Sequence, residues 1–183
     1  MAIRKVARLG HPVLREVARP VDPADIPGPE VQGLIRDLLD TVAEYEGAGL
    51  AAPQVHAPLR IVVLELSAAR GMEVWINPVL TPTTDETLAT WEGCLSVPGL
   101  RGEVRRPGGV EVRALNPRGE PVHLSLKGRP AVVAQHECDH LDGVIYVDKV
   151  EPRTLSFLEE HRRFPPARPG RPPAAPAAAP EEE

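Results

Sequence analysis

Gln-His-Glu-Cys-Asp-His-Leu-Asp-Gly, at residues 135–143, is the stretch from which the expected architecture follows. Pro130 precedes it and Gly143 closes it, and these residues suit the first turn and the stop of a helix. We therefore predict a helix that begins at Pro130 and ends near Gly143. His136 and His140 are four residues apart, so their imidazoles lie on one face of this helix, close enough to share one metal ion.

The residue after the first histidine adds the chemistry of a metal-dependent hydrolase. Glu137 is offset from His136 by about 100° around the helix, so it borders the ion rather than binding it. In this H-E-x-x-H arrangement the ion activates a water, and the carboxylate accepts its proton and later delivers it to a leaving group. The pattern alone also fits two histidines that are merely hydrogen-bonded within a helix, so a third ligand is needed.

A catalytic site of this kind needs three protein ligands and one open position. Cys94, in the Glu-Gly-Cys-Leu-Ser segment at residues 92–96, is the candidate for the third ligand. It could instead be a buried structural thiol, or form a disulfide with Cys138, which a cytosolic setting disfavours. Cys138 lies two residues from His136, so its side chain points away from the histidine face, and we expect it to serve packing.

The other predicted elements describe an α+β domain. Apolar residues recur at helical spacing over residues 29–46, and a short helix is expected over residues 153–163. The Gly-rich segment 47–54 suits a loop or extended chain that something approaches closely. We expect antiparallel or mixed sheets packed around the central metal-binding helix, with one N-terminal and one C-terminal helix. Strands are predicted at 60–66 and 73–77, and a hairpin at 110–115 and 121–126.

Length and composition place these elements in a single domain. The chain has 183 residues, and we expect a catalytic domain over residues 1–164 followed by a disordered Pro/Ala-rich tail over residues 165–183. The net charge of −5, with no basic stripe, argues against specific DNA binding. No apolar run approaches the roughly 20 residues of a membrane span, and no signal peptide is recognised at the N-terminus. We therefore expect a cytoplasmic protein with no membrane partner.

Three motifs together resemble those of the peptide deformylases. The first is G-x-G-L-A-A-x-Q at residues 47–54, the second is E-G-C-L-S at residues 92–96, and the third is Q-H-E-x-D-H-L-x-G at residues 135–143. Residues 9–15 also resemble the N-terminal segment of that family. The similarity extends over about residues 3 to 162. Three motifs in the right order make a far more specific signal than H-E-x-x-H alone.

The resemblance implies a hydrolase that removes the N-formyl group from the initiating formyl-methionine of newly synthesised polypeptides and releases formate. Metal-bound water would attack the formyl carbon, with Glu137 as general base and then general acid. Attack on an amide creates a tetrahedral oxyanion, and donors aimed at that oxygen supply a large share of the rate. The family pattern places the side-chain amide of Gln54 and the backbone N–H of Leu95 there. The same pattern makes Cys94, His136 and His140 the metal ligands.

The resemblance also indicates where the substrate lies. The segment with Gly47 and Gly49 would pair with the peptide backbone like an added strand. Arg101 matches a family position near the peptide chain, although it could be an ordinary surface arginine. Val132 and Val133 are plausible walls of the pocket for the methionine side chain, and helix core is an equally good account of them.

The resemblance favours one Fe²⁺ as the cofactor, although a site of one cysteine and two histidines also accepts Zn²⁺, Ni²⁺ or Co²⁺. A ferrous centre beside a thiolate would be sensitive to oxygen. Because the substrate is a nascent chain, contact with the ribosome is a further hypothesis.

Two other interpretations compete with this one. A zinc endopeptidase would draw its third ligand from a downstream residue such as Glu151, Glu159 or His161, but it would leave Cys94 and Gln54 without roles. A non-catalytic relative that binds metal or formylated peptides should have lost Glu137 or Gln54, and both are present. Formate release from a formylated peptide, set against cleavage of casein, distinguishes the three.

Overall fold

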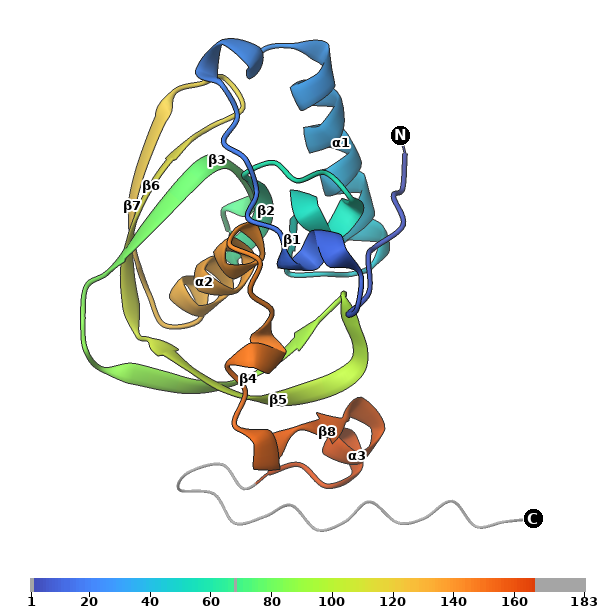
Figure 1. Ribbon diagram of the computed structural model, residues 1–183. Coiled ribbons are helices and arrows are strands. Elements are labelled where there is room, and N and C mark those ends of the chain that lie inside the picture. The colour runs from blue at the N-terminus through green and yellow to red at the C-terminus, as the bar shows by residue number, and fades with distance from the viewer. Residues whose placement is uncertain (1, 68, 167–183) are drawn as a thin grey trace.

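A computed structural model describes residues 2–67 and 69–166 of the chain (Figure 1). Its helices and strands begin with one helix, continue through a run of strands, and end with two helices on either side of a short strand. They are α1 (Pro29–Glu44), β1 (Gly49–Ala51), β2 (Ile61–Ser67), β3 (Gly71–Pro82), β4 (Thr87–Cys94), β5 (Val97–Pro107), β6 (Gly109–Leu115), β7 (Pro121–Lys127), α2 (Arg129–Leu141), β8 (Ser156–Phe157) and α3 (Leu158–Arg163).

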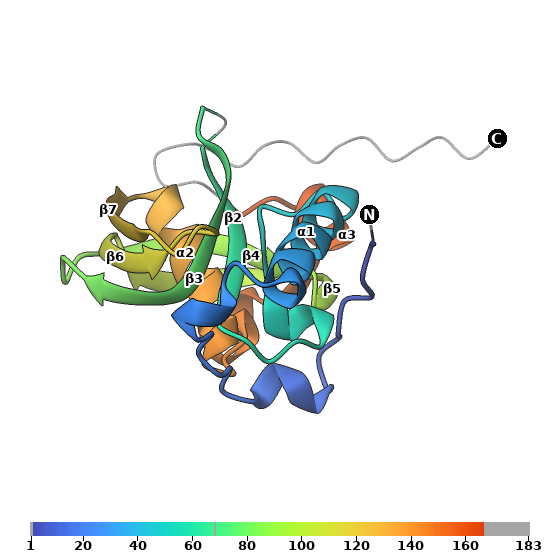
Figure 2. The same cartoon turned by 90° about the horizontal axis from the view of Figure 1, so that it is seen from above.

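The larger sheet has five strands in the order β1-β2-β3-β6-β7, each antiparallel to its neighbour. Side chains of β2 are buried on both faces of this sheet. Ile61 and Val63 belong to the apolar cluster that includes α1, whereas Val62 and Leu64 belong to the cluster that includes α2. Because successive strand residues point to opposite faces, α1 and α2 cover opposite faces of the sheet (Figure 2).

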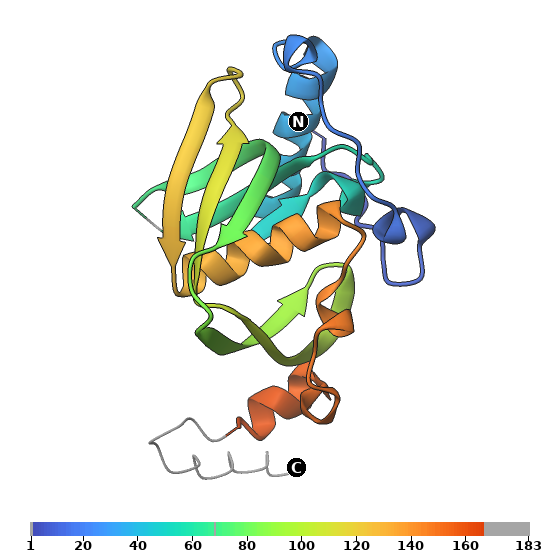
Figure 3. The same ribbon diagram turned by 60° about the vertical axis from the view of Figure 1, so that its left-hand side comes forward.

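The smaller sheet, β4-β5-β8, lies on the other side of α2 (Figure 3). Two side-chain contacts join β5 to α2: Arg106 donates to Asp139, and Gln135 donates to the carbonyl of Pro107. The helix that carries both histidines is therefore held between two sheets. This placement brings Cys94, at the end of β4, to the histidine face.

The predicted α+β class, the antiparallel sheets around the central helix, and the N-terminal and C-terminal helices are confirmed. The Gly-rich segment 47–54 forms β1 and most of a 3-10 turn. Two details of the prediction were wrong. The strands β4 and β5 were not foreseen, and the helix expected over 153–163 is split into a 3-10 turn at Pro152–Thr154, then β8, then α3.

Among the residues that the structure describes, no helix is both long enough and apolar enough to cross a membrane. The tail expected over 165–183 falls, beyond residue 166, outside the described residues.

Candidate metal centre and substrate cavity

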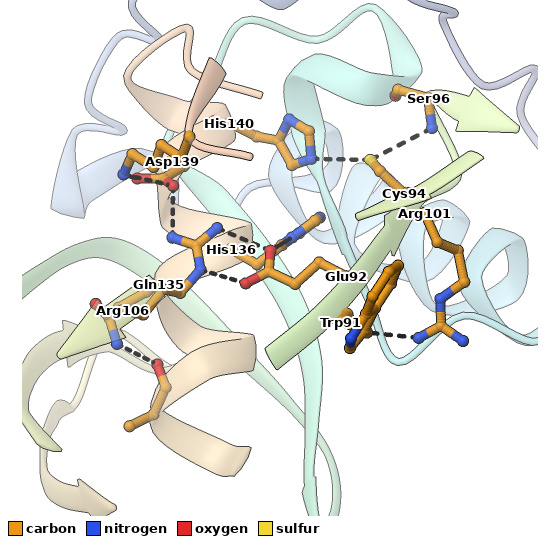
Figure 4. Close-up of polar contacts among 12 residues, drawn as sticks. Trp91, Glu92, Cys94, Ser96, Arg101, Arg106, Gln135, His136, Asp139 and His140 are labelled. Atoms are coloured by element: carbon orange, nitrogen blue, oxygen red, sulfur yellow. Dashed lines mark hydrogen bonds and ion pairs between the residues drawn. The ribbon is translucent and has the colours of Figure 1, made fainter. Parts of the chain in front are cut away.

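Cys94, His136 and His140 come together between β4 and α2. Their candidate ligand atoms all lie within 4.8 Å of one another, and they form the one such group of three or more found in residues 2–67 and 69–166. The Sγ atom of Cys94 lies 3.3 Å from Nε2 of His140 (Figure 4). One thiolate and two imidazoles on rigid elements are a suitable donor set for a divalent ion, with room for one more ligand.

Glu92 orients the first histidine. Its Oε2 lies 2.7 Å from Nδ1 of His136. Burial raises the pKa of Glu92, but hydrogen bonds from His136 and Arg106 outweigh burial and lower the pKa to about 2. The carboxylate is therefore ionised and accepts the Nδ1–H of His136, which leaves Nε2 to face an ion.

Arg106 connects this pair to the rest of helix α2. Its guanidinium is 2% exposed and donates to both oxygens of Glu92, at 2.6 and 2.9 Å, and to Asp139 at 2.7 Å. Asp139 also accepts from Lys149 at 2.7 Å. A chain of alternating charges thus runs from His136 to the protein surface and ties β4 and β5 to the metal helix. Sequence reasoning missed Arg106, because its partners Glu92 and Asp139 are 14 and 33 residues away along the chain.

The immediate surroundings of the histidines also fit a cation. Burial lowers the pKa of His136, but hydrogen bonds with Cys94 and Glu92 outweigh burial and raise the pKa to about 10. The site thus favours positive charge at this imidazole, which a metal ion would supply. Burial lowers the pKa of His140, so this ring is neutral and able to ligate. Its Nδ1 is buried and has no hydrogen-bond partner among the described residues.

Cys138 is placed as its spacing predicts. Both cysteines are free, and Cys138 is buried outside the ligand group. Burial raises the pKa of its thiol, which keeps the thiol protonated. The alternative ligands Glu151, Glu159 and His161 also lie outside the group. His161 instead packs against the ring of Trp91, at 4.3 Å between centroids.

Glu137 lies beside the ligand group with a free oxygen. Its side chain is buried, and Oε2 has no hydrogen-bond partner in the described part of the chain. Burial raises the pKa of this carboxyl to about 7, although the nearby His136 opposes the shift. A group with this pKa exchanges protons readily near neutral pH. The free oxygen therefore suits transfer of a proton to and from a bound reactant.

Gln54 is held so that its NH₂ group faces the metal centre. Its Oε1 accepts from the backbone N–H of Ala51 at 2.8 Å, and its Nε2 lies 3.1 Å from Oγ of Ser96 and 3.4 Å from Sγ of Cys94. The backbone N–H of Leu95 has no acceptor within residues 2–67 and 69–166. The side-chain amide of Gln54 and the backbone N–H of Leu95 are therefore hydrogen-bond donors beside the ligand group.

A cavity of about 890 Å³ opens over this group. Most of the site residues predicted from the sequence line this cavity. His140 is buried and does not line it. Val132 is buried and Val133 is partly buried, and both face the cavity. Arg101 lines it too, with Nη2 donating to the carbonyl of Trp91 at 2.9 Å. The residues brought together at the cavity are Gly47, Gly49, Gln54, Cys94, Leu95, Arg101, Val132, Val133, His136 and Glu137.

Known proteins with similar sequences and structures support the interpretation of this cavity as an enzyme site. A profile described as "Polypeptide deformylase" matches residues 3–155. Peptide deformylase 1 of Prochlorococcus marinus is 46% identical over 170 residues, covering 87% of this chain and 88% of that protein. A chloroplastic/mitochondrial peptide deformylase 1A of Arabidopsis thaliana is 40% identical over 172 residues, covering 85% of this chain and 64% of that protein. The crystal structure of peptide deformylase from Thermotoga maritima has a TM-score of 0.78 and 36% identity, covering 83% of this chain and 100% of that chain.

Proposed function

The chain belongs to the polypeptide deformylase family. On this premise we propose a role for each of the main residues of its cavity. The protein is a metal-dependent hydrolase that removes the N-formyl group from nascent peptides. One observation supports the roles proposed for individual residues: Cys94, His136 and His140 lie together beside the free carboxylate oxygen of Glu137.

Cys94, His136 and His140 are the proposed ligands of one divalent ion. When bound, such an ion polarises the formyl carbonyl and lowers the pKa of a water molecule. Glu92 keeps a proton on Nδ1 of His136, so that Nε2 is presented to the ion in one orientation. Arg106 keeps Glu92 ionised and fixed in place.

Glu137 is the proposed general base and acid. Its unpartnered Oε2 takes the proton of the attacking water, and the same oxygen passes that proton to the departing amine. Because burial raises its pKa to about 7, neither the gain nor the loss of the proton is strongly opposed at neutral pH.

Gln54 and Leu95 are the proposed donors to the oxyanion. The contact of Gln54 Oε1 with the N–H of Ala51 leaves its NH₂ group turned to the centre. The N–H of Leu95, next to Cys94 in the chain, offers the second donor. Loss of one such donor typically costs about a hundredfold or more in kcat.

The peptide chain is proposed to extend along β1. This strand pairs with β2 on one side, and as the first strand of the sheet it borders the cavity with its other edge. An added strand there would place its backbone against Gly47 and Gly49. Val132 and Val133 form the proposed wall for the methionine side chain, and Arg101 lies along the path of the peptide.

We favour Fe²⁺ as the native ion on the strength of the family resemblance. The donor set itself also accepts Zn²⁺, Ni²⁺ and Co²⁺. Elemental analysis of anaerobically purified protein tests this choice, and zinc at one equivalent with no iron would overturn it.

Nascent chains are the family's substrates, and we propose that the enzyme works in the compartment where they are made, in contact with the ribosome. The free thiols of Cys94 and Cys138 are consistent with a reducing compartment such as the cytoplasm. Cosedimentation with ribosomes tests the contact, and failure to cosediment with translating ribosomes would contradict it.

Formate release from formyl-Met-Ala tests the division of roles. The Glu137→Ala variant should keep its metal and lose nearly all turnover, whereas full activity in this variant would end the assignment of Glu137. Cleavage of casein by the wild type, without formate release, would favour the endopeptidase alternative.

A further inference from the structure

Four cationic side chains surround the mouth of the cavity. They are Lys5, Arg8, Arg129 and Arg162, which we call the basic rim, and all four are exposed and line the same cavity as Cys94 and His136. Lys5 and Arg8 belong to the N-terminal segment, Arg129 is the first residue of α2, and Arg162 lies on α3. The fold therefore brings three distant segments together with the same sign of charge.

The described part of the protein does not neutralise the charges of the basic rim. Within residues 2–67 and 69–166, the ion pairs engage other cations and none engages the four rim residues. Arg101 differs, because its guanidinium already donates to the carbonyl of Trp91. The chain as a whole carries a net charge of −5, so overall composition does not explain this local excess of positive charge.

The carboxylates of the cavity do not offset the rim either. Glu92 and Glu137 are the acidic residues that line the cavity within the described residues, and both are buried. Glu92 is already paired with Arg106 and His136. A ligand at the mouth therefore meets positive charge, in a setting open enough for salt to screen it.

Helix α2 sets the distance from the rim to the reacting centre. Arg129, Val133, His136 and Glu137 lie at positions i, i+4, i+7 and i+8, which share one face of a helix. At 1.5 Å per residue, Arg129 stands about 10 Å along the axis from His136. An extended peptide advances about 3.3 Å per residue, so the second and third residues of a substrate held at the centre lie at a distance from it comparable with that of Arg129.

We propose that the basic rim selects formylated peptides that carry carboxylate side chains just after the first residue. This inference rests on the proposed function and adds a substrate preference to it. Carboxylates at the second and third residues are attracted by the unpaired cations, while lysines there are repelled. The attraction acts on binding, so the preference lies in KM more than in kcat.

Three C-terminally amidated peptides test the preference: formyl-Met-Glu-Glu, formyl-Met-Gln-Gln and formyl-Met-Lys-Lys. Near 25 mM salt, kcat/KM should be about tenfold higher for the Glu peptide than for the Gln peptide, and lowest for the Lys peptide. Near 250 mM salt the ratio should fall to about two or three. Equal values for the Glu and Gln peptides, or a ratio that salt does not change, would overturn the proposal. Formate release from the Gln peptide reports separately on the deformylase activity itself.

Substitutions in the basic rim test whether its residues cause the preference for carboxylate side chains. Arg129→Gln and Arg162→Gln should each reduce the Glu-to-Gln ratio about threefold. Arg113→Gln is the matched control, because Arg113 is an exposed arginine of β6 that does not line the cavity, and it should leave the ratio unchanged. An unchanged ratio in both rim variants, with weaker ribosome cosedimentation instead, would assign the rim to RNA phosphates and refute the proposal.

Discussion

Gly49 lies directly against the carboxylate of Glu137. A Cβ atom added at position 49 would lie 2.5 Å from Oε1 and 2.6 Å from Cδ of that side chain. Real Cβ atoms do not approach other atoms so closely, so any side chain at this position must displace the carboxylate. The second glycine of the Gly-rich segment thus has a role in addition to its proposed pairing with the substrate, because it leaves space for the proposed general base.

Gly49→Ala should therefore lower kcat by roughly ten- to a hundredfold, because a shift of the base by about 1 Å is enough to misplace proton transfer. The metal content should stay at the wild-type level, since Cys94, His136 and His140 are untouched. Steady-state formate release and metal analysis of the same sample check both parts.

Gly33→Ala is the matched control for that variant. A Cβ at Gly33, in α1, meets nothing nearer than Nη2 of Arg36 at 3.8 Å. Alanine there should keep full activity and gain up to about 1 kcal/mol in helix stability. Loss of activity in both glycine variants would attribute the effect to folding rather than to Glu137.

The two cysteines should differ in metal binding. Cys94→Ala removes one of three proposed ligands, so the affinity for the ion should fall by several orders of magnitude, whereas Cys138→Ala should bind metal like the wild type. Competition with a chromogenic chelator measures both. An equal loss of metal from the two variants would contradict the ligand set. Cys138→Ala should lose some stability, because its thiol is buried.

Arg106→Ala should destabilise the protein by about 3–5 kcal/mol, because it leaves Glu92 and Asp139 as buried or half-buried charges without their partner. Chemical denaturation measures this change. Arg105→Ala is the control on the same strand, since its side chain is 70% exposed and its ion pair with Glu103 is 3.7 Å long. That variant should change stability by about 0.5 kcal/mol or less. Similar losses in the two variants would refute the buried role of Arg106.

The activity should fall on the acid side of neutral pH. Glu137 can serve as the proposed base only when ionised, and burial raises its pKa to about 7. A bound cation attracts the carboxylate charge and moves this pKa lower, so the acid limb of kcat/KM should begin below about pH 7 and then drop about tenfold per pH unit. A rate that stays flat from about pH 7 down to about pH 4 would contradict Glu137 as the base.

Much of the fold could be predicted from periodicity. The apolar spacing of α1, the Pro and Gly limits of α2, and the hairpin of β6 and β7 are local patterns, and the structure has each of them. Strand β5 could not be predicted, because Pro98, Gly99 and Gly102 interrupt any alternation. Its long pairing with β4 depends on contacts across the hairpin and with α2, which local sequence does not report.

In the candidate site, too, the features set by local sequence could be predicted and those set by long-range contacts could not. The positions of His136, His140 and Glu137 follow from helical spacing, and that of Cys94 was inferred from its motif. The contact of Arg106 with Glu92 and Asp139 links residues 14 and 33 positions apart in sequence. No periodic pattern marks such a pair, so its role in holding His136 could only be recognised in three dimensions.

Removal of the formyl group should depend on one ion held by Cys94, His136 and His140. Titration of metal-free protein with Fe²⁺ under anaerobic conditions, with formate release from formyl-Met-Ala measured at each step, tests it most directly. We predict no activity without metal and a linear rise that ends at about one equivalent, as expected for a single three-ligand site. Formate release that is undiminished in the metal-free protein, or absent at full occupancy, would contradict it.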